Sequence, residues 1–131
     1  MKFTFLAALL LTSATALAGP HDELAVARQH EHEASTRVSY YEMQATIADR
    51  DAATARIIRD TASKQRAHAQ SAHDNAAAAA ADQRAAEAVK DERKAQDRAA
   101  QSRTEVDRAR IDLQASQDEV RRLERVARAS R

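Results

Sequence analysis

Glycine and proline, the residues that most often end a helix, occur at a single place in this chain. Gly19 and Pro20 stand side by side, and the chain has one of each and no cysteine. Alanine, the best helix former, recurs about every three or four residues from there to the end. The sequence therefore predicts an all-α protein, a long Ala-rich helix with heptad (coiled-coil) character and no globular core.

Residues 1–18 have the three parts of a secretory signal peptide. Lys2 supplies the positive charge, Phe3–Leu11 is apolar, and Ala16-Leu17-Ala18 offers small residues at the third and first positions before a cut. The apolar run is shorter than the roughly 20 residues that span a membrane. We expect cleavage near Ala18, a helical region over residues 19–131, and a periplasmic or secreted protein.

Charge and composition argue against several functional classes. The chain has 21 Lys+Arg and 20 Asp+Glu, and removal of Lys2 with the leader leaves 20 against 20. Nucleic-acid binding requires a basic excess, so we do not expect it. The sequence has no Gly-rich phosphate loop and no nucleophile or zinc motif, and a thin rod shields little from water. We predict no enzyme activity, no cofactor and no metal site; His30 and His32, two residues apart, do not share a helix face.

Two heptad seams run along the helical region. One extends from Leu24 to Ala55 and fades where Arg59 and Arg66 take the next a positions, and the other starts at Ala78 and continues to the carboxyl end. Tyr41 falls at a d position of the first seam and is the largest side chain in that seam. The clearest seam residues are Val38, Tyr41, Ala45, Ala48, Ala99, Val106, Ala109, Leu113, Val120 and Leu123.

The two seams are out of register with each other. Ala52 and Ala78, both at a positions, are 26 residues apart, two short of four heptads. The mismatch lies beside His73-Asp74-Asn75, and Asp and Asn favour helix starts. An antiparallel helical hairpin turning near residues 71–76 is the alternative fold. Because this segment has no glycine and six alanines follow it, one nearly continuous helix of roughly 160 Å is the preferred interpretation.

The function expected from these features is structural. We expect an exported protein that self-associates or pairs with another helical envelope protein, with no large exposed apolar patch. In composition the chain is similar to bacterial periplasmic alanine-zipper lipoproteins, but it lacks their lipid-acceptor cysteine and terminal lysine. The alternative is a module that binds metal ions or, by weak membrane or peptidoglycan contact, anionic envelope lipids and polymers. The residues expected to make that anionic contact are Arg121, Arg122, Arg125, Arg128 and Arg131.

Overall fold

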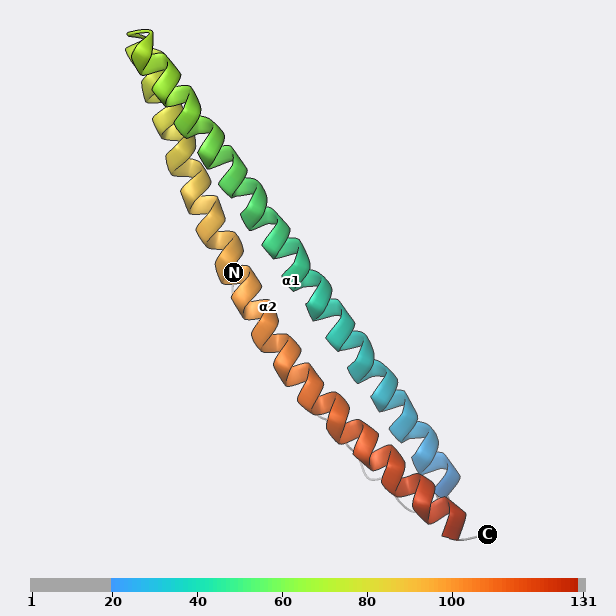
Figure 1. The fold of residues 1–131 in the computed structure, drawn as a ribbon. Coiled ribbons are helices and arrows are strands. Elements are labelled where there is room, and N and C mark those ends of the chain that lie inside the picture. The colour runs from blue at the N-terminus through green and yellow to red at the C-terminus, as the bar shows by residue number, and fades with distance from the viewer. Residues whose placement is uncertain (1–19, 130–131) are drawn as a thin grey trace, which may run out of the picture.

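The protein is an antiparallel pair of long α-helices. The computed structural model describes residues 20–129, in which α1 runs over Pro20–Ser71 and α2 over Asn75–Ala129 (Figure 1). The all-α prediction and the hairpin alternative are confirmed, and the preferred single continuous helix is wrong. The expected signal peptide (residues 1–18), Gly19, Ser130 and Arg131 lie outside the described residues. Within residues 20–129, neither helix contains a stretch that is long and apolar enough to cross a membrane.

The turn between the helices is built without glycine. His73 adopts the left-handed conformation with φ of 58°, and its N–H donates to the carbonyl of Gln70 at 3.1 Å. The N–H of Asp74 donates to the carbonyl of Ala69 at 2.9 Å, which completes a Schellman motif at the end of α1. Asp74 then caps α2, because its Oδ1 accepts from the N–H of Ala77 at 2.9 Å. The expected cap is confirmed, and the left-handed residue is a histidine.

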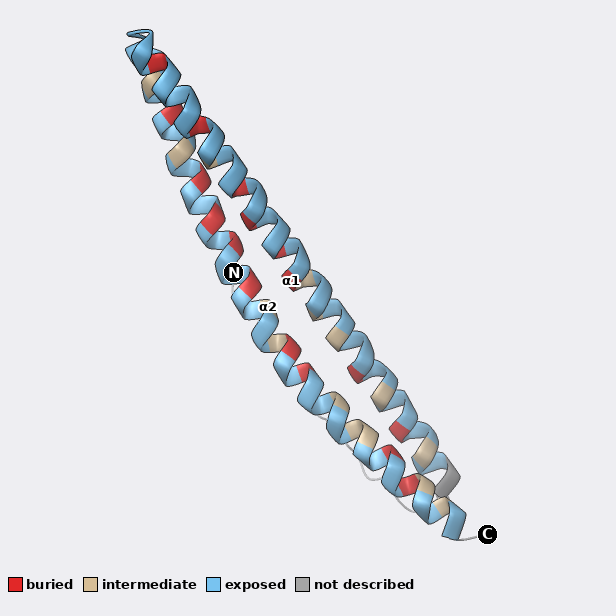
Figure 2. Cartoon of the chain, viewed as in Figure 1, coloured by how far each residue is buried: buried red, intermediate tan, exposed pale blue. Residues whose placement is uncertain are grey.

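Alanines from both helices form the buried interior. Within the described residues, every position of the two predicted seams is buried or half-buried, and Figure 2 shows the buried residues along the sides where the helices face each other. Small side chains allow close helix approach, and toward the turn the buried apolar residues are all alanines, at Ala62, Ala69, Ala81 and Ala88. Larger side chains gather at the open end, where Leu24 and Ala27 pack with Val120 and Leu123.

The first seam does not fade after Ala55, contrary to expectation. Ala62 and Ala69 continue its d positions and are 2 % and 6 % exposed. The arginines at the intervening a positions pair with acids of α2. Arg59 Nη1 donates to Glu92 Oε2 at 2.6 Å, and Arg66 Nε lies 3.1 Å from Asp82 Oδ1. Arginine fits this seam because α2 supplies a carboxylate opposite each one.

Ion pairs in the middle of the hairpin have the opposite polarity to those near the turn and to the Arg28–Glu124 pair at the open end. Toward the middle of the hairpin α1 provides the acids, and Asp49 and Glu42 pair with Arg103 and Arg110 at 2.7 and 2.8 Å. Toward the turn α1 provides the bases. Each exposed pair contributes at most about 1 kcal/mol, but the reversal of polarity along the hairpin matches only one alignment of the two helices. Side-chain charge therefore helps to fix the register of an otherwise uniform alanine seam.

Candidate interaction surfaces

The exposed side of α1 carries a nearly uncharged strip, one edge of which, at Tyr40 and Ile47, borders a groove that α2 also lines. All ten residues of the strip are exposed, and only one of them, Arg50, is charged. Tyr40, Met43, Ile47 and Ile57 are 52 %, 51 %, 45 % and 67 % exposed, respectively. We call this strip the α1 outer face, and its members are Thr36, Ser39, Tyr40, Met43, Thr46, Ile47, Arg50, Ala53, Thr54 and Ile57.

The threonines of the α1 outer face are less polar than their residue type suggests. Thr36, Thr46 and Thr54 each donate their hydroxyl to the backbone carbonyl four residues earlier, at 2.9 Å in all three cases. These donors are already satisfied within the helix, so covering them leaves no donor unpaired. A partner packed on this face therefore pays little desolvation cost at the threonines.

The corresponding strip of α2 is strongly charged. It lies at the same level along the hairpin as the α1 outer face, and all ten of its residues are exposed too. Five of the ten are charged, and Ile111 is its single large apolar side chain. We call it the α2 outer face, and its members are Arg93, Lys94, Asp97, Ala100, Gln101, Thr104, Asp107, Arg108, Ile111 and Gln114.

Four large apolar residues of α1 are exposed on one side of the helix, at Tyr40, Met43, Ile47 and Ile57. A solvated helix normally presents charged and polar residues on its outer side, as α2 does. The sequence does carry a signal for the α1 outer face. Tyr40, Met43, Ile47 and Ile57 recur at spacings of three, four and ten residues, which places them on one side of a helix but away from the alanine seam. The heptad pattern of the alanines does not include these four residues, so it does not reveal the α1 outer face.

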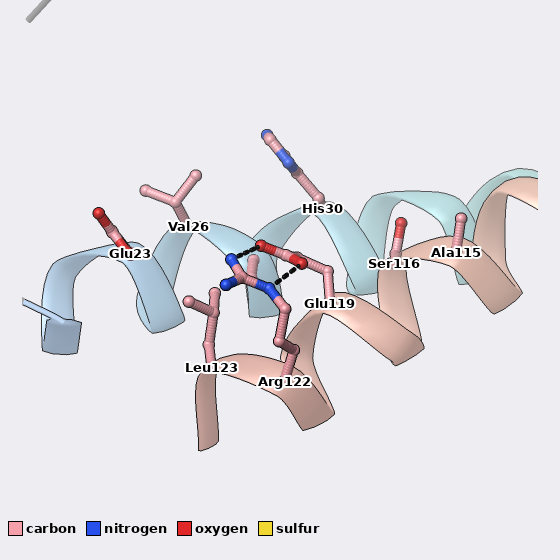
Figure 3. Close-up of a pocket in the computed structure, with 9 residues that line it drawn as sticks. Glu23, Val26, His30, Ala115, Ser116, Glu119, Arg122 and Leu123 are labelled. Carbon is pink, nitrogen blue, oxygen red and sulfur yellow. Dashed lines mark hydrogen bonds and ion pairs between the residues drawn. The ribbon is translucent and has the colours of Figure 1, made fainter. Parts of the chain in front are cut away.

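A groove of about 640 Å³ lies between the helices at the open end of the hairpin. Ala27 of α1 and Leu123 of α2 give it an apolar floor. In Figure 3 the Arg122 guanidinium and the Glu119 carboxylate lie beside this floor, and the imidazole of His30 points away from them. Arg122 Nε and Nη2 donate to Glu119 Oε2 and Oε1 at 2.7 and 2.6 Å.

The electrostatics of this groove are those of a closed ion pair. The hydrogen bond from Arg122 lowers the pKa of Glu119 below its ordinary value, and the same bond raises the pKa of Arg122. Both groups stay charged at neutral pH and neutralise each other. Within residues 20–129, no group of three or more His, Asp or Glu side chains is placed to hold a metal ion. The groove therefore offers an apolar contact surface, and its Arg122 and Glu119 side chains are already paired with each other.

The arginines expected at an anionic surface are divided between two sides of α2. Arg121, Arg125 and Arg128 line one shallow groove together with the acids Asp118 and Glu124. Arg122 lies in the other groove, bonded to Glu119. Carboxylates therefore accompany the arginines on both sides. Arg131 lies outside the described residues.

The tyrosine pair also divides between two surfaces. Tyr41 is half-buried at the seam, as its d position predicted, and Tyr40 is exposed on the α1 outer face. Their rings meet edge to face with centroids 5.3 Å apart. The ten seam residues named from the sequence lie between α1 and α2, so the hairpin itself covers them.

No family model, curated protein or solved structure matches this chain.

Proposed function

We propose that the protein is an exported structural or interaction protein whose hairpin presents the α1 outer face to a helical partner. The observation that carries the proposal is the exposure of Tyr40, Met43, Ile47 and Ile57 on one side of one helix. Apolar residues scattered singly over a surface need no explanation, but a strip with a single charge over about 32 Å of helix is unusual for a solvated face.

The geometry favours a helix as the partner. The strip is one helix wide, and its large side chains stand among the small residues Ser39, Thr46 and Ala53. Such alternation of large and small side chains forms the ridges and grooves into which another helix packs. The proposed site is therefore outside the seam, since the seam is occupied within the chain.

Export is supported by the leader pattern of residues 1–18. The test is to produce the full chain with its own leader in a bacterial host and to determine the N-terminus of the protein in each cell fraction. We expect a periplasmic or secreted protein that begins at Gly19. Recovery only from the cytoplasm with Met1 in place would contradict this part of the proposal.

Docking on the α1 outer face is tested by photo-crosslinking in the producing cell. A photoreactive phenylalanine analogue replaces Ile47 on the α1 outer face or, as the matched control, Gln114 on the α2 outer face. We expect Ile47 to give a protein adduct of defined mass and Gln114 to give none. Equal labelling from both positions, or none from Ile47, would contradict the proposal.

The alternative function, binding of anionic envelope polymers or metal ions, has weaker support. Asp118, Glu119 and Glu124 lie among the arginines that would have to bind the polymer. An anionic polymer therefore meets mixed charge on both sides of α2, and replacement of Arg121, Arg125 and Arg128 by glutamine measures what they contribute to vesicle or peptidoglycan binding.

A further inference from the structure

We infer that the partner on the α1 outer face is a second copy of this chain, packed antiparallel so that two hairpins form a four-helix assembly. The inference rests on the proposed function, because it names the partner of the same face. Its basis is that the α1 outer face is complementary to itself when one copy is turned end over end. Such a two-fold contact uses one surface twice and closes at a dimer.

The apolar residues match when the two-fold axis passes between Ala48 and Asp49. Tyr40 and Ile57 are then equally distant from the axis on opposite sides, so each faces the other residue type on the second copy. Met43 faces Thr54 in the same way. Ile47 meets the aliphatic stem of Arg50, whose charged head reaches water at the edge. Each large side chain is thus placed against a smaller or flexible one.

The charges beyond the ends of the face also match. Glu33 and Lys64 continue the same side of α1, one before the face and one after it, and both are exposed. The same axis brings Glu33 of one copy to Lys64 of the second copy, twice per dimer. Opposite charges at both ends fix the alignment of the two helices and penalise slippage by one heptad.

A parallel pair is disfavoured by the same residues. Parallel, aligned helices place each residue against its own copy, so Glu33, Arg50 and Lys64 would each face a like charge. The α2 outer face has no comparable solution, because five of its ten residues are charged and only Ile111 is large and apolar. The contact therefore belongs to α1 and has one direction.

The first test is sedimentation equilibrium of the protein as recovered from the producing cell, over micromolar concentrations. We expect a reversible monomer–dimer equilibrium. Ile47→Gln with Ile57→Gln is expected to weaken it at least tenfold, because four apolar side chains per dimer lose their burial. Ile111→Gln, the same change on the α2 outer face, is expected to leave it unchanged. A monomer at all concentrations, or equal weakening by Ile111→Gln, overturns the inference.

The second test reads the direction of packing by disulfide trapping, which is clean because the chain has no cysteine. Met43→Cys mixed with Thr54→Cys is expected to give a mixed disulfide dimer. Either variant alone is expected to give little, since the two copies of residue 43 would lie about 16 Å apart along the axis, beyond disulfide reach. Trapping of each variant with itself, or no trapping in the mixture, overturns the antiparallel arrangement.

The third test uses charge. Lys64→Glu is expected to weaken the dimer several-fold and to make its affinity rise with salt, and adding Glu33→Lys to the same chain is expected to restore it. Helicity measured by circular dichroism serves as the folding control for each variant. A double variant as weak as Lys64→Glu alone overturns the pairing of Glu33 with Lys64.

The outcomes separate this inference from the proposed function. A photo-adduct from Ile47 with the mass of two chains supports both. An adduct with a different protein, together with a monomer in sedimentation, overturns the second copy as partner and keeps the docking role of the face. An adduct with residues 1–19 of the same chain overturns both the second copy as partner and the docking role of the face. The absence of any adduct overturns both as well.

Discussion

α1 and α2 are alike on their inner sides and different on their outer sides. Both contribute a seam of alanines that is buried against the other helix. On the outer side, one of ten residues is charged in α1 and five of ten are charged in α2. The inner sides account for the hairpin, because each covers the other. The outer side of α1 is not explained by folding of the single chain, and this difference is the basis on which we propose α1 as the interaction helix.

The inner and outer positions are expected to differ most in their effect on stability. Leu123 is 4 % exposed in the open-end cluster, whereas Ile111 is 68 % exposed. Leu123→Ala is expected to lower the free energy of unfolding of the monomer by about 2 kcal/mol, and Ile111→Ala by less than about 0.5 kcal/mol. Urea denaturation monitored by circular dichroism measures both. Equal losses at the two positions would remove the distinction between inner and outer sides.

The charged layer of the seam gives the next largest effect. Glu92 is 7 % exposed, and it accepts from Arg59 at 2.6 Å and from Arg56 at 3.1 Å. Arg59→Ala is expected to cost about 1–3 kcal/mol, because it removes one partner of a buried carboxylate. Adding Glu92→Ala to that variant is expected to recover part of the loss, since two alanines extend the seam. A double variant less stable than Arg59→Ala would show that this layer is needed as an ion pair.

The turn offers a test of what separates the two helices. His73 holds a left-handed conformation that glycine adopts without steric cost, so His73→Gly is expected to raise the free energy of unfolding by about 1 kcal/mol. Asp74→Ala removes the cap of α2 and is expected to lower it by about 1 kcal/mol. Thermal unfolding of the two variants gives the comparison. A destabilised glycine variant would contradict the assigned turn geometry.

The smallest expected effect is a pH dependence at the open end. Because the pKa of Glu119 is lowered in the folded protein, its bond with Arg122 stabilises the fold above the ordinary carboxyl pKa of 4.5. That contribution is lost as the pH falls through the lowered folded-state pKa. The free energy of unfolding of Glu119→Gln is therefore expected to depend less on pH in this acid range than that of the native chain. Identical profiles would show that the exposed pair contributes nothing measurable.

The sequence predicts the inner side of this fold well. Heptad spacing identified the positions that the hairpin buries, since burial in a two-helix contact follows the spacing alone. It did not decide between rod and hairpin, because the turn at His73 uses a left-handed residue that composition does not mark. It also ended the first seam too early, since Arg59 and Arg66 reach across the seam to Glu92 and Asp82, acids that lie far along the chain. The α1 outer face was missed because alanine dominates the composition of the helical region, and the heptad pattern of the alanines marks only the inner side.

The chain folds back on itself, and we propose that the outer side of α1 is thereby left to a partner. Spin labels on cysteines at Gln29 and Arg125, diluted with unlabelled protein, test the hairpin through the distance between them within one chain. Arg28 Nη2 lies 3.0 Å from Glu124 Oε1 in the hairpin, so we expect a short distance, about 10 Å between backbones plus the label arms. A separation near 140 Å, that of a single helix, would contradict the account.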